Sequence, residues 1–174
     1  MFNKLALLRL FLEQPSREFS VREASRAVRI APATASKKLK EYTKKGILKE
    51  RKERVLKLYK ADVESCSYTD LKIYYNMRKI RESGLLEAIN RFYLKPAVVL
   101  FGSASSGMDT ETSDFDLVVI SEKTAEFPGL KAFEKKINRR LQLFAVKDIR
   151  EVKNEHLINN ILNGIVLQGR IRWT

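Results

Sequence analysis

Residues 97–120 read AVVLFGSASSGMDTETSDFDLVVI, and this stretch decides the fold of the carboxyl-terminal half of the chain. Its first five residues form an apolar run with β-branched side chains, which predicts a buried strand. Its last seven residues also predict a strand. Because side chains alternate along a strand, Asp114 and Asp116 are expected to point to the same face. The segment between the two runs is rich in small and polar residues and opens with Gly102 and Ser103.

The two aspartates and the glycine-serine turn suggest a site for a cation and an anion. Two carboxylates side by side repel each other, and their spacing suits a shared hard cation such as Mg²⁺, which prefers oxygen ligands. A turn at Gly102-Ser103 leaves backbone N–H groups free to hold a phosphate, especially if a helix begins at Ser103. The sequence thus offers an anion cradle and a cation site within fifteen residues.

These two motifs resemble the signature of the DNA polymerase beta superfamily, most closely the minimal nucleotidyltransferases of prokaryotes. Ten residues separate Ser103 from Asp114, a spacing similar to that of the family's Gly-Ser and Asp-x-Asp pairs. The resemblance covers about residues 96–174. It implies that Asp114 and Asp116 hold Mg²⁺ or Mn²⁺ on a nucleoside triphosphate, with ATP as the expected substrate, and that Gly102 and Ser103 grip its β- and γ-phosphates. A hydroxyl on a protein or a nucleic acid would attack the α-phosphorus and expel pyrophosphate.

Two positions depart from the family pattern. Active members usually carry a third carboxylate on a later strand; that strand is expected at 141–146, and Gln142 stands where the acid would be. An amide oxygen can ligate Mg²⁺, but it brings no charge and cannot act as a general base. Ser106 stands where minimal members often carry an arginine, which removes a phosphate contact. Other acids that could replace the missing carboxylate are expected instead to be solvated at the surface: Asp109, Glu111 and Asp148.

Positive charge is concentrated in the first third of the chain. The whole chain carries 34 Lys and Arg against 21 Asp and Glu, a net charge of +13, and residues 1–60 hold 17 of these cations and only 6 of the acids. A basic module joined to a nearly neutral one indicates two tasks, and the basic module points to a polyanion as its partner. A lysine-rich solvated face is the alternative.

The basic module is expected to contain three helices followed by a hairpin. Ser20 is the expected N-cap of the second helix, with Glu23 placed to complete a capping box. The expected elements are a first helix with Leu5, Leu8 and Leu12 on one face, a second helix to about Val28, a third helix from about 33 to 45 that stops at Gly46, and strands at 47–49 and 55–59.

This order of elements resembles the winged helix-turn-helix fold of bacterial and archaeal regulators, over about residues 1–60. The stretch ATASKKLKEYTKKGILKE at 33–50 is similar to that family's recognition helix running into the wing. The resemblance implies that the third helix enters the major groove of DNA and that the wing touches the backbone or the minor groove, with binding that weakens as salt rises. Protein docking alone is the alternative. The residues expected at the DNA are Thr34, Ser36, Lys37 and Lys38 on the third helix, Arg22 and Arg26 near phosphates, and Arg51, Lys52 and Arg54 on the wing.

The whole chain is therefore expected to be an α+β protein of two domains. A winged helix-turn-helix domain at 1–62 is followed by a helical linker at 63–95 and by a nucleotidyltransferase-type mixed sheet with flanking helices at 96–174. Within the linker, Gly84 separates two helices. The first of them is expected to carry an apolar stripe formed by Leu71, Tyr74, Met77 and Ile80.

The remaining composition excludes several classes. A single cysteine, Cys66, rules out an internal disulfide framework, and with a single histidine, His156, no Cys/His zinc site can be built. No apolar run approaches the roughly 20 residues that span a bilayer, so no membrane partner and a cytoplasmic location are expected. A homodimer is expected by analogy with winged-helix regulators.

Two functions remain open at this point. The first is a nucleotidyltransferase that its winged helix brings to DNA or to a partner bound there, and the glycine-serine and aspartate pairs favour it. The second is a DNA-binding transcriptional regulator, or an antitoxin-like protein with a toxin as its partner, whose second domain keeps the fold without turnover. Gln142 and the concentration of charge in residues 1–60 favour the second.

Overall fold

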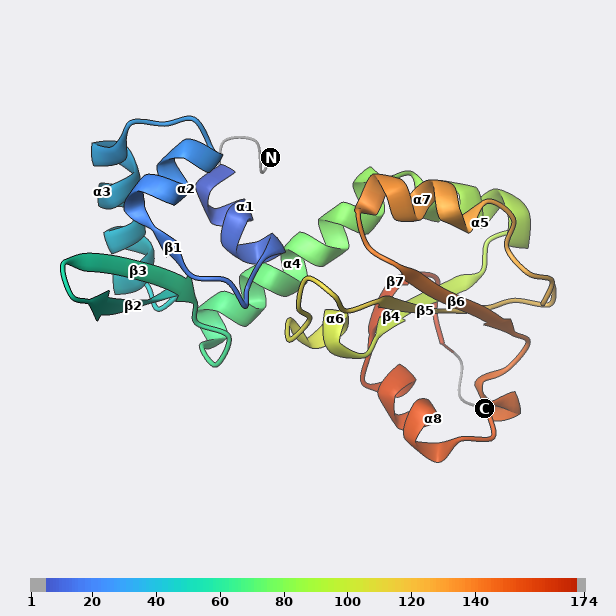
Figure 1. Ribbon diagram of the computed structural model, residues 1–174. Helices are drawn as coiled ribbons and strands as arrows, with labels where there is room; N and C mark the ends of the chain where they lie inside the picture. The colour runs from blue at the N-terminus through green and yellow to red at the C-terminus, as the bar shows by residue number, and fades with distance from the viewer. Residues whose placement is uncertain (1–5, 172–174) are drawn as a thin grey trace. The chain divides into compact units, whose positions relative to one another are not determined.

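The computed structural model describes residues 6–171, which divide into two compact units between Lys72 and Ile73. The division lies inside helix α4 (Cys66–Glu82). Each unit has its own sheet, of three strands in the first and four in the second (Figure 1). The fold class is α+β, as the sequence predicts. Within residues 6–171, every helix is too short or too polar to cross a bilayer.

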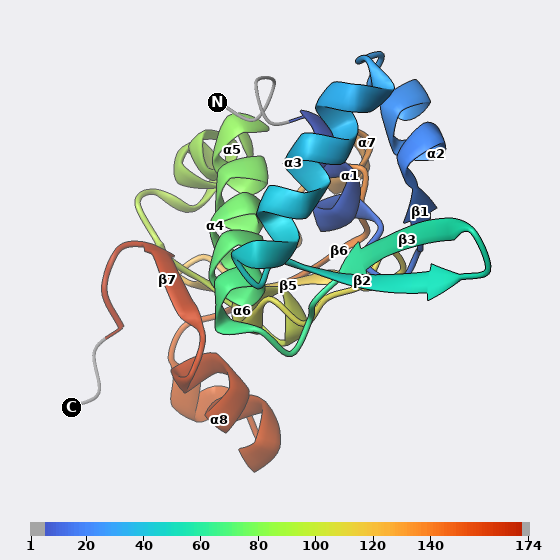
Figure 2. The ribbon, with the colours of Figure 1, turned by 90° about the vertical axis from the view of Figure 1, so that its left-hand side faces the viewer.

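The first unit packs three helices against a small antiparallel sheet of order β1-β3-β2 (Figure 2). The two-residue strand β1 was not among the expected elements: Phe19 and Ser20 pair with Tyr59 and Leu58 of β3. The elements of this unit before α4 are α1 (Ala6–Glu13), β1 (Phe19–Ser20), α2 (Val21–Ala27), α3 (Pro32–Lys44), β2 (Leu48–Glu53) and β3 (Leu56–Ala61).

Local sequence signals set the ends of α2 and α3. The Ser20 hydroxyl oxygen accepts a hydrogen bond from the Glu23 N–H at 3.2 Å, and the Glu23 carboxylate accepts one from the Ser20 N–H at 2.8 Å, so the predicted capping box is confirmed. Pro32 occupies the first turn of α3. Gly46 follows the helix with a φ of +67°, a value that a residue without Cβ adopts at no steric cost.

Helix α4 buries a face that overlaps the predicted apolar stripe only in part: Ile80 is buried and Met77 packs against the core, but Tyr74 is not buried. Tyr74 is 39% exposed, whereas Lys72 and Asn76 are each 1% exposed. The ammonium group of Lys72 donates a hydrogen bond to the carbonyl oxygen of Leu12, which satisfies the buried charge in part. The residues of α4 buried in the structure are Tyr68, Lys72, Tyr75, Asn76 and Ile80.

The second unit is built on a mixed sheet of order β6-β5-β4-β7, in which β5 and β6 run parallel and the other pairs antiparallel. The predicted strand at 141–146 is confirmed as β6. Helix α7 was not among the expected elements. The elements are α5 (Leu85–Tyr93), β4 (Ala97–Phe101), α6 (Ser103–Ser106), β5 (Phe115–Ile120), α7 (Leu130–Ile137), β6 (Leu141–Val146), a 3₁₀ turn at Ile149–Glu151, α8 (Glu155–Leu162) and β7 (Ile165–Gln168).

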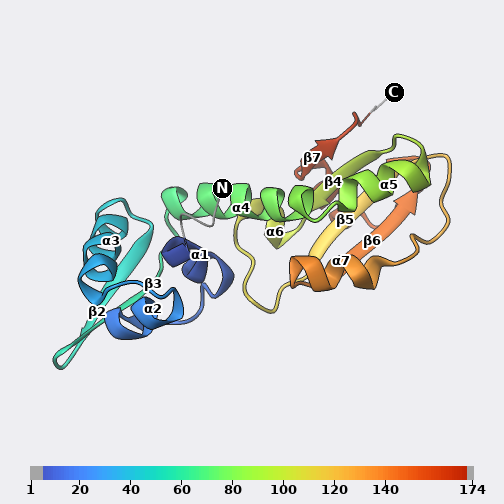
Figure 3. The ribbon, with the colours of Figure 1, turned by 90° about the horizontal axis from the view of Figure 1, so that it is seen from above.

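Helices cover both faces of this sheet. Helices α5 and α7 lie on one face, where Leu117 of β5 and Ile137 of α7 belong to one buried apolar cluster (Figures 1 and 3). Helix α8 lies on the other face, where Val118 packs in a second cluster with Ile161. Because side chains alternate along β5, Asp116 lies on the α8 side of the sheet.

Candidate functional site

The two aspartates stand at the start of β5, at one end of the sheet. Asp114 immediately precedes the strand, and Asp116 is its second residue, paired in register with Phe101 of β4. Both side chains are half-buried. The pKa of Asp116 is raised, first by burial and then by the negative charge of Asp114. The two carboxylates therefore lie close enough to repel each other.

Gly102, at the end of β4, faces Asp116 directly. Its φ of 71° and ψ of −157° lie in a region that only glycine adopts readily. A Cβ added at this position would lie 2.6 Å from Oδ2 of Asp116. The backbone conformation and the neighbouring carboxylate thus both require glycine here, and the Asp116 carboxylate lies in the space that a side chain at this position would take.

A short helix starts directly after this glycine. Helix α6 begins at Ser103 and ends at Ser106, and the N–H of the next residue, Gly107, donates to the Ser103 carbonyl oxygen. The Ser103 side chain is half-buried, whereas Ser106 is exposed. The glycine-serine turn and the carboxylate pair, predicted from motifs ten residues apart, lie side by side at the same end of the sheet.

Gln142 completes this end of the sheet from β6. It pairs in register with Asp116, and its amide nitrogen donates a hydrogen bond to Oδ2 of Asp114 at 2.8 Å. The amide of Gln142 therefore lies beside the aspartates, where the family resemblance leads us to expect a third acid. In this rotamer its nitrogen, rather than its oxygen, points toward the carboxylate.

The acids that could replace a third carboxylate lie elsewhere. Asp109 is only 2% exposed, so the expectation that it is solvated at the surface is wrong: its Oδ1 accepts a hydrogen bond from Asn76 at 2.6 Å. Glu111 is exposed. Asp148 pairs with Arg150 at 2.7 Å, beyond the far end of β6. Over residues 6–171, no group of three or more His, Cys, Asp and Glu side chains is placed to share a metal ion.

Asn76 is a residue of this region that the sequence pattern does not reveal. Its amide nitrogen donates both to Asp109 and, at 3.0 Å, to the carbonyl oxygen of Ala104 in α6. Helix α4 thereby holds α6 and the loop that leads to Asp114. A polar residue inside an otherwise amphipathic helix was the available signal, but its partners lie about thirty residues later in the chain.

The fold and the residues at the end of the sheet define an α+β domain with two carboxylates beside a glycine-serine turn. Residues 82–165, slightly less than half of the chain, match the family model described as nucleotidyltransferase domain. Members of this family in general transfer a nucleoside monophosphate and use a nucleoside triphosphate with a divalent metal ion. No curated protein matches the chain.

The residues expected at DNA all belong to the first unit, on α2, α3 and the β2–β3 hairpin (Figure 2). Ser36 and Lys38 are half-buried, and the others are exposed: Arg22, Arg26, Thr34, Lys37, Arg51, Lys52 and Arg54. Lys40 and Lys44 line the same outer face of α3 as Lys37 and were not among the expected residues. Their helical spacing from Lys37 was the signal that could have revealed them.

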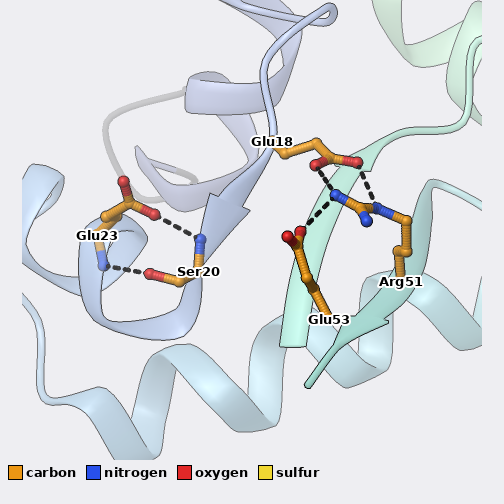
Figure 4. A network of polar contacts seen from close by, with 5 residues as sticks. All are labelled: Glu18, Ser20, Glu23, Arg51 and Glu53. Atoms are coloured by element: carbon orange, nitrogen blue, oxygen red, sulfur yellow. Dashed lines mark hydrogen bonds and ion pairs between the residues drawn. The ribbon is translucent and has the colours of Figure 1, made fainter. Parts of the chain in front are cut away.

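Arg51 differs from the other cations because two carboxylates hold it (Figure 4). Its guanidinium group donates to both carboxylate oxygens of Glu18, at 3.1 and 2.7 Å, and to Glu53 at 2.9 Å. The ion pairs raise the pKa of Arg51 and lower that of Glu18. This arrangement ties the segment before β1 to the hairpin and neutralises the charge that Arg51 could offer a phosphate.

Proposed function

We propose that this chain is a nucleotidyltransferase that moves a nucleoside monophosphate from a Mg²⁺-bound nucleoside triphosphate, with ATP as the first choice, to a hydroxyl of a protein or a nucleic acid. The observation that carries this proposal is the carboxylate pair of Asp114 and Asp116 beside a glycine that has no room for a side chain. The family match over residues 82–165 supports the same class of chemistry.

The residues at this end of the sheet fit a divalent cation. Asp114 and Asp116 would hold it, with the amide oxygen of Gln142 as an uncharged third ligand after the amide turns over. Burial and like-charge repulsion raise the pKa of Asp116, and a cation between the two carboxylates would offset both effects. When bound, the ion neutralises charge on the triphosphate and on the oxygens that enter and leave the α-phosphorus.

The chain's own groups position the nucleotide around these carboxylates. Gly102 allows the turn to lie directly against the Asp116 carboxylate, and Ser103, the next residue, offers a hydroxyl to a phosphate beside it. The reaction forms a bond from the acceptor oxygen to the α-phosphorus, breaks the bond to the pyrophosphate oxygen and releases the hydroxyl proton. Gln142 cannot accept that proton, because an amide is not a base at neutral pH.

A labelling experiment tests the proposal. The full chain is incubated with labelled ATP, GTP, CTP or UTP, with Mg²⁺ or Mn²⁺, and with lysate from its own cells. Label is expected on an acceptor with the wild-type chain and with Glu111→Gln, an exposed acid of the preceding loop that serves as the matched control. Label should vanish with Asp114→Asn. If no acceptor is labelled with either metal and calorimetry detects no triphosphate binding, the proposal fails.

We further propose that the first unit is a winged helix-turn-helix domain that binds DNA. The support is the order of its elements, the antiparallel arrangement β1-β3-β2, and the exposed cations of α2, α3 and the hairpin. Lys37, Lys40 and Lys44 follow one another along the outer face of α3 and are therefore placed to approach phosphates together. Arg51, held by Glu18 and Glu53, contributes to the shape of the wing rather than to phosphate binding.

One observation favours the second candidate function, a DNA-binding regulator or antitoxin-like protein without turnover. Gln142 donates its amide hydrogen to Asp114, so the third position of the site lacks negative charge and the bond occupies a carboxylate oxygen. A site with one carboxylate fewer binds a divalent cation more weakly. The substitution Gln142→Asp, which places an acid at this position, distinguishes the two candidates.

A further inference from the structure

The positive charge of the carboxyl-terminal module is gathered in ten residues. From residue 96 to the end of the chain there are 11 Lys and Arg and 10 Asp and Glu. Residues 131–140 hold 5 of these cations and 1 of the acids, so that 6 cations and 9 acids remain for the rest of the module. Helix α7 and the turn after it are thus a basic patch within residues 96–174, which are otherwise slightly acidic.

This basic patch surrounds a hollow of about 450 Å³. Lys131, Lys135 and Arg140 are exposed there. The one acid of the wall, Glu134, turns its Oε1 to accept a hydrogen bond from the Leu141 N–H at 2.9 Å, and its carboxylate is therefore engaged by the sheet. The hollow consequently presents mainly cations to a ligand.

The hollow lies near the start of β5, but on a different face of the sheet from Asp116. The Phe115 N–H donates to the carbonyl oxygen of Arg140 at 2.9 Å, so the turn after α7 adjoins the start of β5. Helix α7 covers one face of the sheet, however, whereas Asp116 lies on the opposite face, which α8 covers (Figure 1). The hollow and the carboxylates are thus at the same end of the sheet but on different faces.

We propose that this hollow binds the phosphate backbone of a single-stranded nucleic acid whose terminal hydroxyl lies at Asp114 and Asp116 as the acceptor. The inference rests on the proposed transferase function and names its acceptor. The hollow and Asp116 lie on different faces of the sheet, and a strand has a phosphate at every nucleotide, so its backbone can occupy the hollow while its terminal hydroxyl lies at the carboxylates. Ammonium and guanidinium groups recognise these phosphates through charge-assisted hydrogen bonds and release condensed counterions.

The test uses the full chain and a 5′-labelled single-stranded oligonucleotide with a photoreactive base near its 3′ end. Lys131→Gln, Lys135→Gln and Arg140→Gln are combined in one variant, with Lys147→Gln and Lys153→Gln as the matched control. Cross-linked peptides are mapped so that binding to the first unit is counted separately. The triple variant is expected to lose most of the cross-links within residues 131–147. Its oligonucleotide affinity in this module should fall at least tenfold, with a salt slope smaller by about 2.

Triphosphate binding, measured by calorimetry with Mn²⁺, should be the same in the triple variant and the wild-type chain. Unchanged cross-linking would overturn the proposal. A fall in triphosphate affinity would also overturn it, by placing the hollow in the nucleotide site. Label on a protein acceptor without cross-links in this module would refute the hollow alone. Cross-links at the hollow without label on any acceptor would refute both the transferase and the acceptor role.

Discussion

Gly102→Ala tests whether glycine is required by the neighbouring carboxylate as well as by the backbone. The φ of 71° and ψ of −157° cost a residue with Cβ about 1–3 kcal/mol. The new Cβ would lie 2.6 Å from Oδ2 of Asp116. Moving the carboxylate away adds about 0.5–1.5 kcal/mol if its rotamer is displaced by about 30°. We therefore expect the free energy of unfolding to fall by about 1.5–4.5 kcal/mol.

Urea unfolding followed by circular dichroism measures this loss, and Gly129→Ala is its matched control. Gly129 has a φ of +78°, but nothing lies within 4 Å of an added Cβ, so only backbone strain of about 1–2 kcal/mol is expected. Repeating Gly102→Ala in an Asp116→Ala background removes the steric contact, and the cost should drop to the strain alone. Calorimetry should also show at least a tenfold weaker binding of the Mn²⁺-triphosphate complex to Gly102→Ala.

Two results would refute this reasoning. If Gly102→Ala destabilises the chain no more than Gly129→Ala does, the contact with Asp116 carries no energy. If Gly102→Ala lowers the free energy of unfolding by the same amount with and without the Asp116 side chain, the whole loss comes from backbone strain.

Gln142→Asp should raise Mn²⁺ affinity tenfold or more and increase labelling, because it adds a charged ligand; calorimetry without any gain would show that this position lies outside the metal site. Lys37→Ala should weaken DNA binding and lower its salt slope by about 1, whereas Arg51→Ala should leave the slope unchanged, which gel shifts over a salt series can decide. Arg150 lowers the pKa of Asp148 to about 2, so this carboxylate stabilises the fold above its unfolded-state pKa and stops doing so as the pH falls through about 2. The stability difference between Asp148→Asn and wild type should accordingly shrink from pH 7 to pH 2, and a constant difference in urea unfolding would contradict the assigned ion pair.

Local patterns predict the strands of the second unit well. The apolar runs at 97–101 and 141–146 are bounded by turns, and both form strands with the expected limits. The family resemblance places Gln142 near the two aspartates, and the observed register pairs it with Asp116. The limits of the strands depend only on neighbours within a few residues, which is the range over which sequence patterns are informative.

Contacts between residues far apart in the chain could not be predicted from the sequence. Lys72 and Asn76 are buried in α4 because Leu12 and Asp109, far away in the chain, supply their hydrogen-bond partners. The predicted apolar stripe is therefore right at Ile80 and wrong at Tyr74. A period of 3.6 residues gives the helix, but it cannot show which polar residues find a partner inside the fold.

The same limit explains why the ion pairs of Arg51 were not expected. Arg51 is indistinguishable in sequence from its neighbours on the wing, and only the fold brings Glu18 to its guanidinium group. Helix α7 was missed although its signal is local: Leu130, Phe133 and Ile137 recur at helical spacing within its eight residues. Its positive charge indicates a binding site only once the fold places the turn after it next to the start of β5.

The structure of the carboxylate pair is itself an argument for a ligand. A glycine in a conformation open only to glycine, and a half-buried aspartate that a second aspartate repels, both lower the stability of this end of the sheet. A strand end with a purely structural role would be more stable with an uncharged residue at 116. A cation bound between the two carboxylates would offset this repulsion. Gln142 adds no negative charge to this end of the sheet, and its amide nitrogen donates a hydrogen bond to Asp114, so binding through the amide oxygen would require the amide to turn over.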